Sequence, residues 1–120
     1  MKLYLAGPMR GYPQFNFPAF HEAAAQLREE GHEVFSPAER DIKRHNGVDI
    51  SVDNSTGCEK TASRLHGFDL REAFADDTAW ICRHADGLAL LSGWETSKGA
   101  CAEYALAAAL GLPVFLWEPV

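Results

Sequence analysis

The chain has 120 residues, of which 47% are hydrophobic and 23% are charged, so it is long enough for one globular core and too short for two. Its formal net charge of −6 argues against a nucleic-acid polymer as partner, because such binders carry a broad basic surface. The longest apolar stretch, residues 104–117, is too short for a membrane span and is interrupted by Gly111 and Pro113. Three cysteines without metal or disulfide spacing and the absence of a secretory signal predict a cytoplasmic protein that is not membrane-bound.

The first part of the chain predicts a strand, a helix and a second strand. Residues 3–6 are a short apolar run, and the glycines and proline of residues 7–11 end it in a loop. A helix is expected next, because apolar residues recur at three- and four-residue steps: Phe17, Phe20, Ala24 and Leu27. Asn16 is expected to cap this helix and Gly31 to follow its end. Residues 33–36 predict the second strand.

The remainder of the chain begins with a segment of different character. Residues 39–67 are polar and have little apolar periodicity, so they predict a long insert without regular structure, such as a lid. Residues 70–84 predict a helix, and residues 87–91 predict a strand that is buried on both faces. After a glycine-bounded loop, residues 98–110 predict a helix that is apolar nearly all round. Residues 113–117 predict the last strand.

Strands that alternate with helices indicate a parallel sheet with right-handed crossovers. We therefore expect an α/β fold: a single domain over residues 1–120 with a small doubly wound sheet of four or five strands, Rossmann-like or flavodoxin-like. In such sheets the active site lies beyond the carboxyl ends of the strands. Residues 7–11 follow the first strand and residues 92–99 follow the third, so these two loops are expected to form the site.

Glu103 is the most informative single residue. It is the only charged residue between Lys98 and Glu118, and most of its neighbours are apolar. Burying a carboxylate in such surroundings costs free energy unless the group is paired or used. Two interpretations remain open at this point. Glu103 is either a surface glutamate on a thin polar face or a catalytic carboxylate close to a glycine-bounded loop.

Two segments could hold an anion. Ser97 could cap the last helix, and the unpaired N–H groups near Gly99 would then favour negative charge, although a plain N-cap has the same pattern. Arg10 adds a guanidinium within a glycine-containing loop. Asp77 stands beside Asp76, an arrangement typical of a solvated helix surface. The five histidines lie at no ligand spacing, so no metal is expected.

Three segments together resemble a known family. They are Tyr4-Leu5-Ala6-Gly7-Pro8-Met9-Arg10-Gly11, Asn16-Phe17-Pro18-Ala19-Phe20, and Gly93-Trp94-Glu95-Thr96-Ser97-Lys98-Gly99-Ala100 followed by Glu103. These segments are similar to a small uncharacterised domain that is common in bacteriophage and bacterial genomes and belongs with the nucleoside 2-deoxyribosyltransferase-like superfamily. The resemblance covers nearly the whole chain. That superfamily includes nucleoside 2-deoxyribosyltransferases and 2′-deoxynucleoside 5′-phosphate N-hydrolases, both of which cleave the bond between base and deoxyribose.

The resemblance implies roles for particular residues. At the reaction centre it implies a glutamate that attacks C1′, an aspartate that contacts the leaving base or sugar, and a tyrosine that orients the glutamate: Glu103, Asp77 and Tyr4. For binding of the substrate and its 5′-phosphate it implies residues from both loops and from the start of the first helix: Gly7, Met9, Arg10, Gly11, Asn16, Ser97 and Gly99. No cofactor is implied. The resemblance also implies a homodimer or a larger homo-oligomer.

The chemistry of these residue types agrees with the resemblance. A carboxylate beneath C1′ can stabilise the developing sugar cation or form a glycosyl intermediate, and a second acid can protonate the leaving base. Our first hypothesis is therefore cleavage of the N-glycosidic bond of a deoxynucleoside 5′-monophosphate, by hydrolysis or base transfer. A catalytically silent nucleotide-binding module is an alternative, because Pro8, Ser97 and Ala100 alter the expected motifs. A 2-deoxyribosyltransferase for unphosphorylated nucleosides is another.

Overall fold

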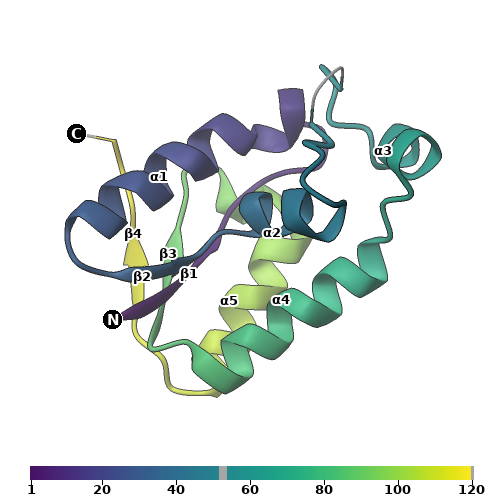
Figure 1. Ribbon diagram of the computed structural model, residues 1–120. Coiled ribbons are helices and arrows are strands. Elements are labelled where there is room, and N and C mark those ends of the chain that lie inside the picture. Colours follow the sequence, from purple (N-terminus) through teal and green to yellow (C-terminus); the bar gives the residue numbers. More distant parts are fainter. Residues whose placement is uncertain (52–53, 120) are drawn as a thin grey trace.

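The computed structural model describes residues 1–51 and 54–119 and contains a four-stranded parallel sheet (Figure 1). The strands are β1 (Lys2–Ala6), β2 (Glu33–Phe35), β3 (Gly87–Leu90) and β4 (Val114–Leu116). Their order in the sheet is β2-β1-β3-β4, and each neighbouring pair is parallel. The predicted α/β class and all four strand positions are confirmed, and the arrangement is that of a small Rossmann-like or flavodoxin-like fold.

Helices cover both faces of this sheet. Helix α1 (Phe17–Glu29) packs on one face, whereas α4 (Leu70–His84) and α5 (Lys98–Ala109) pack on the other (Figure 1). Every residue of β3 is buried, as expected for a central strand between two helical layers. Because side chains alternate along a strand, Leu5 enters the core beneath α1 and Tyr4 enters the core beneath α4 and α5. The sheet thus presents Tyr4 to the same side as α5.

The two loops that were expected to form the site begin next to each other. Strands β1 and β3 are neighbours, and the N–H of Leu91 donates to the carbonyl of Ala6 at 2.8 Å. Gly7 follows immediately. A Cβ atom on Gly7 would lie only 2.8 Å from the Cβ of Leu91, so glycine allows the first loop to leave the sheet at this crowded position. Residues 7–11 and 92–97 therefore start at the same end of the sheet.

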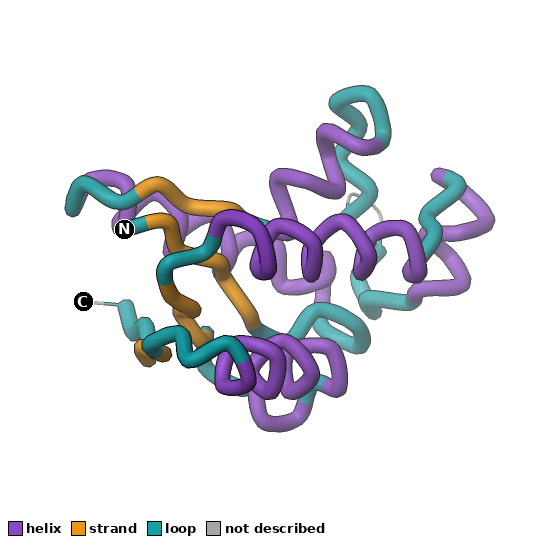
Figure 2. Tube along the Cα trace, turned by 90° about the horizontal axis from the view of Figure 1, so that it is seen from below, coloured by secondary structure: helices purple, strands orange, loops and turns teal. Residues whose placement is uncertain are grey.

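The insert contains regular structure, and the prediction of an irregular segment over residues 39–67 is wrong in this respect. Helix α2 (Pro37–Arg44) starts shortly after β2, and α3 (Glu59–His66) follows farther along. The hydrophobic pattern does not reveal α2, because one of its buried residues is the charged Asp41, and α3 buries only Ala62. Strands gather near the two termini, and helices and loops fill the other end of the molecule (Figure 2).

Asn16 does not cap α1 with its side chain, which corrects the prediction made for it. Its φ is +60°, and its Nδ2 instead donates to the carbonyl of Pro8 at 3.1 Å. Gly57 of the insert also contacts the loop that follows β1. It accepts a hydrogen bond from the N–H of Gly11 at 2.9 Å, and with φ at +66° its Cα lies so close that a Cβ would be 2.1 Å from the carbonyl oxygen of Tyr12. The insert and the first loop therefore pack backbone to backbone.

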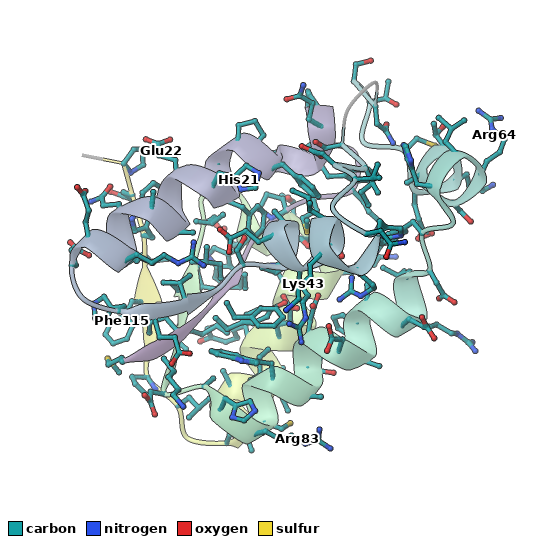
Figure 3. All side chains as sticks on the ribbon, viewed as in Figure 1. His21, Glu22, Lys43, Arg64, Arg83 and Phe115 are labelled. Carbon is teal, nitrogen blue, oxygen red and sulfur yellow. The ribbon has the colours of Figure 1, made fainter. Side chains whose placement is uncertain are left out.

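The outer surface carries many polar side chains, and large apolar side chains are exposed at several places, among them the sheet edge. Side chains such as Glu22, Lys43 and Arg64 point away from the ribbon (Figure 3). On edge strand β4, by contrast, Phe115 and Leu116 are 44% and 70% exposed. No helix among the described residues is both long enough and apolar enough to cross a bilayer.

Candidate active site

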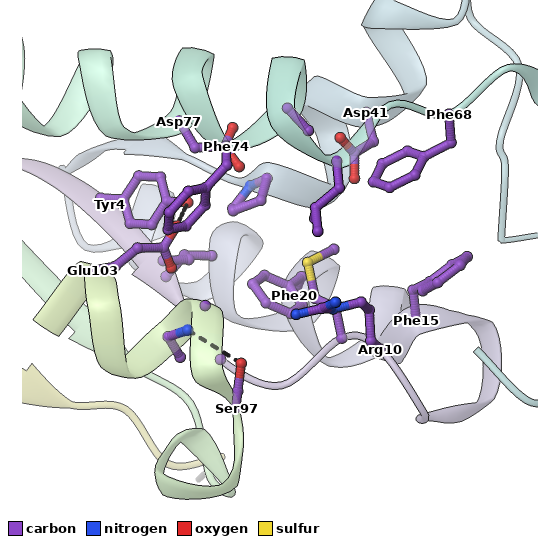
Figure 4. Close-up of a pocket in the computed structure, with 18 of the residues that line it drawn as sticks. Tyr4, Arg10, Phe15, Phe20, Asp41, Phe68, Phe74, Asp77, Ser97 and Glu103 are labelled. Atoms are coloured by element: carbon purple, nitrogen blue, oxygen red, sulfur yellow. Dashed lines mark hydrogen bonds between the residues drawn. The ribbon is translucent and has the colours of Figure 1, made fainter. Parts of the chain in front are cut away.

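One pocket at the carboxyl ends of β1 and β3 brings together most of the residues expected to form the site (Figure 4). Its walls come from β1, the first loop, α1, the insert, α4 and the start of α5. The expected residues that line it are Tyr4, Gly7, Met9, Arg10, Asp77, Ser97, Gly99 and Glu103. Gly11 and Asn16 do not line it. Their hydrogen bonds to Gly57 and Pro8 shape the loop instead.

Helix α5 carries Glu103 into the pocket. Ser97 caps this helix as predicted, since its Oγ accepts a hydrogen bond from the N–H of Ala100 at 3.1 Å. Glu103 lies on the buried face of the helix with Ala100 and Ala107, and only 6% of its surface is exposed. The interpretation of Glu103 as a surface glutamate is therefore wrong. A carboxyl group in such a position requires a partner.

Tyr4 supplies that partner. Its hydroxyl donates to Oε2 of Glu103 in a buried hydrogen bond (Figure 4). The fully buried Tyr4 ring stacks on Phe35, with ring centroids 5.4 Å apart, and this packing fixes the position of the hydroxyl. Burial, with a further contribution from Glu103, raises the pKa of Tyr4 well above its ordinary value, so the hydroxyl keeps its proton.

The environment of Glu103 disfavours its charge. Burial raises its pKa to about 8, and the hydrogen bond from Tyr4 offsets only part of this effect. An adjacent positive charge would reverse that balance, because it would stabilise the ionised form. Glu103 is therefore a carboxyl group that gains most from a ligand carrying, or developing, positive charge beside it.

Two adjacent aspartates on α4 have opposite environments. Asp76 is partly exposed and pairs with Arg40 at 2.7 Å and with Arg44 at 2.9 Å, which lowers its pKa to about 2. Asp77 is only 7% exposed and lines the pocket, and its Oδ1 has no hydrogen-bond partner among the described residues. Burial, reinforced by Asp41, raises the pKa of Asp77 to about 7. The prediction of a solvated pair is correct for Asp76 alone, because successive helical residues point about 100° apart.

Asp41 of the insert is a pocket residue that the sequence did not suggest. It is 5% exposed, and its Oδ1 accepts a hydrogen bond from Arg44. Burial raises the pKa of Asp41 to about 6 even though Arg44 acts in the opposite direction. The sequence feature that could have pointed to Asp41 is its three-residue spacing from Arg44. Such pairs are common on exposed helix surfaces, so the spacing alone does not indicate a pocket.

The opposite side of the pocket is suited to an anion. Arg10 and Ser97 line both the pocket and a shallow groove next to it, to which Lys98 also contributes. The guanidinium of Arg10 is about half exposed and lies 3.5 Å from Glu59. The N–H groups of Lys98 and Gly99 open α5, where no preceding helical carbonyl is available and the helix dipole favours negative charge. A phosphate group fits this combination of donors.

The rest of the wall is apolar and largely aromatic. It is made of Leu5, Phe15, Phe20, Ile50, Phe68, Leu70, Ala73 and Phe74. Flat aromatic surfaces of this kind suit a planar ring such as a nucleobase. Several of these residues lie in or beside the insert, where the polar context hides them in the sequence. Among the described residues, no cluster of three His, Cys, Asp or Glu side chains is placed to hold a metal ion.

Comparison with known proteins identifies the family of the chain. A family model described as a domain of unknown function, DUF4406, matches residues 1–116. The chain belongs to this family. No curated protein and no solved structure matches it. The matched range contains the whole sheet and every residue that lines the pocket, so the site lies within the DUF4406 domain.

The buried carboxyl groups predict how the stability of this DUF4406 protein depends on pH. Glu103 and Asp77 have folded-state pKa values above those of an unfolded chain, so their stabilising contribution is complete below about pH 4 and is lost as pH rises through their folded values. We expect the free energy of unfolding to fall by about 2–4 kcal/mol between about pH 5 and pH 9. Urea unfolding at a series of pH values measures this change. Glu103→Gln should flatten the profile, and an equally steep fall in that variant would contradict the assignment.

Proposed function

We propose that this protein cleaves the N-glycosidic bond of a deoxynucleoside 5′-monophosphate, with Glu103 as nucleophile and Asp77 as general acid. The observation that carries the proposal is the pairing of two buried carboxyl groups in one pocket. One is held by a tyrosine hydroxyl, and the other has an oxygen without a hydrogen-bond partner among the described residues. The resemblance of residues 97–103 and of the first loop to nucleotide N-hydrolases supports the same reaction.

The proposed reaction has two steps. In the first, Glu103 has lost its proton to solvent, and its carboxylate attacks C1′ while the bond from C1′ to the base nitrogen breaks and Asp77 gives its proton to the departing base. Positive charge develops on the sugar, and this charge favours the ionised form of Glu103. In the second step, water attacks C1′ of the glycosyl ester and releases Glu103, and the Asp77 carboxylate takes up the proton of that water. A second base in place of water would give transfer.

The anion-binding side of the pocket supports a 5′-phosphate on the substrate. Arg10 provides a charged donor, while the start of α5 provides backbone N–H groups and the Ser97 hydroxyl. Lys98 in the adjoining groove adds a second cation where the phosphate would meet solvent. A free nucleoside would leave these donors without a partner.

Arg10→Ala tests the phosphate assignment. We expect the KM for a deoxynucleoside monophosphate to rise about 10- to 100-fold, because a charge-assisted contact is lost, whereas kcat/KM for the matching nucleoside stays the same. Steady-state assays of base release with both substrates measure the difference. An equal loss on nucleoside and nucleotide would rule out a phosphate contact for Arg10.

The activity itself is tested with a panel of the common deoxynucleosides and their 5′-monophosphates. Chromatography should detect free base and the sugar phosphate from at least one monophosphate. Base exchange between two nucleosides without hydrolysis, unaffected by Arg10→Ala, would select the transferase instead. Stabilisation by nucleotides in thermal unfolding without any turnover would select the silent binding module. Finding neither turnover nor binding would reject all three.

We also propose that the protein works in the cytoplasm, where nucleoside monophosphates are available. The three cysteines support this location because all of them are unpaired thiols, and thiols persist in a reducing compartment. Cys82 is exposed and the other two are partly buried.

A further inference from the structure

One carboxyl group in the pocket has no part in the proposed reaction. Asp41 comes from α2, whereas Glu103 and Asp77 come from helices that pack on the sheet. Only one hydrogen bond to its side chain is present among the described residues, from Arg44 to Oδ1. Its side chain lies on the pocket wall beside Phe68 (Figure 4). The other carboxylate oxygen is therefore available to a ligand there.

Arg44 ties this carboxylate to Asp77. Its Nη1 donates to Asp41, and its Nη2 lies 3.6 Å from Oδ1 of Asp77. Both carboxyl groups therefore lie against one guanidinium. Oδ1 of Asp77 is buried on the side of Arg44 and accepts no hydrogen bond among the described residues. Asp41 and Asp77 both line the pocket, together with aromatic side chains.

We propose that Asp41 is a specificity-determining residue that accepts a hydrogen bond from the exocyclic amino group of the leaving base, while Asp77 donates to the ring nitrogen beside that amino group. The ligand class is a base with an amino group next to a ring-nitrogen acceptor, as in adenine and cytosine. This inference rests on the proposed function, because it assigns the base half of the substrate of the same site.

The protonation of the two aspartates agrees with this pairing. The pKa of Asp41 is about 6, and that of Asp77 is about 7. Burial raises both pKa values, and the hydrogen bond from Arg44 favours an ionised acceptor at Asp41 and so leaves a shared proton on Asp77. That arrangement is the complement of an amino group next to a bare ring nitrogen. Donation by Asp77 to this edge also prepares the proton that the departing base requires.

The pocket would discriminate between amino bases and oxo bases through the group that stands in the place of the amine. Hypoxanthine and uracil carry a carbonyl oxygen where adenine and cytosine carry the amino group. This oxygen would face the Asp41 carboxylate, so two acceptors would meet in a buried pocket without a donor between them. Sites that hydrogen-bond a polar group reject analogues lacking it by large factors. We expect about 10-fold tighter binding of the amino member of each pair, because an oxo base would bind only if the proton moved to Asp41 and weakened its hydrogen bond with Arg44.

The test compares matched nucleotides in a background that cannot turn them over. Glu103→Gln is titrated calorimetrically at about pH 6.5 with dAMP against dIMP and with dCMP against dUMP. The same titrations follow in Glu103→Gln/Asp41→Asn, where the amide can offer either a donor or an acceptor. The matched control is Glu103→Gln/Asp69→Asn. Asp69 is exposed, it does not line the pocket, and asparagine can replace it as the N-cap of α4.

Each outcome decides the inference. The inference is supported if Glu103→Gln binds an amino nucleotide more tightly than its oxo partner and Asp41→Asn reduces this difference in affinity to about threefold or less, while Asp69→Asn does not. Equal or tighter binding of the oxo nucleotides overturns it, whether or not Asp41→Asn folds, and leaves the N-glycosidase proposal intact. Preference that survives Asp41→Asn overturns the role of Asp41. No binding of any nucleotide, together with no base release by the unaltered protein, overturns the proposed function as well.

Discussion

Glu103→Gln is expected to reduce kcat for base release at least about 10³-fold. The amide has nearly the same shape and can still accept the hydrogen bond from Tyr4, but it is a very poor nucleophile and carries no charge to stabilise the developing sugar cation. Binding of the nucleotide should persist. The measurement is the rate of base release under saturating substrate, together with the dissociation constant from calorimetry.

The matched control for this variant is Glu22→Gln. Glu22 is an exposed residue of α1 that points away from the molecule (Figure 3) and does not line the pocket. Its substitution should leave kcat unchanged. Mass spectrometry after rapid quenching should also detect a sugar phosphate attached to the unaltered protein and none attached to Glu103→Gln. Retention of more than a tenth of the activity by Glu103→Gln would exclude Glu103 as the nucleophile.

Asp77→Asn is expected to lower kcat about 10²- to 10⁴-fold, because the departing base would lose its proton donor. The loss should depend on the leaving group. A deoxynucleotide of 7-methylguanine already carries a positive charge on its base and needs no proton to depart, so in a single turnover Asp77→Asn should release this base nearly as fast as the unaltered protein does. Single-turnover rates of base release from this nucleotide and from unmethylated dGMP measure the effect, because the later attack of water also uses Asp77. An equal loss on both substrates would indicate a structural role for Asp77 instead.

Substitutions of the two neighbouring aspartates, Asp76 and Asp77, should also have different effects on the stability of the protein. Asp77→Asn removes a buried group whose charge is disfavoured, so at about pH 8 the free energy of unfolding should stay the same or increase. Asp76→Asn removes a carboxylate whose pKa is lowered by two arginines, so the free energy of unfolding of that variant should decrease. Urea unfolding of both variants is the measurement. A destabilised Asp77→Asn would show that its carboxylate is held by favourable contacts.

Outside the insert, the order of strands and helices was predictable because the apolar periodicity of the core is strong. The glycines and prolines between the elements mark their ends, and the helix over residues 70–84 agrees at both ends. Glu103 stood out because it interrupts an apolar helix. Its burial could not be settled from that pattern, since it depends on Tyr4, which lies 99 positions away along the chain.

The insert was predicted least well, and its composition explains why. Helix α2 packs through Asp41 and its neighbours Pro37 and Ala38, so a charged residue occupies a buried position that the pattern would assign to an apolar one. The arginine that makes this possible comes from the same helix, but its second and third carboxylate partners lie on α4. Neither periodicity nor spacing within one segment can reveal such a contact.

The close backbone packing of Gly57 against Tyr12 joins two parts of the molecule that contribute different residues to the pocket. The residues that we propose to act on the bond belong to the sheet and to the helices packed on it, whereas Asp41, Ile50 and Phe68 reach the same pocket from a segment inserted between β2 and α4. We expect that exchanging that segment would change the shape and polarity of the pocket wall while Tyr4, Asp77 and Glu103 stay in place. The contact at Gly57 would then fix the position of the exchanged segment. On the proposed function, a change of substrate would require replacement of this segment alone.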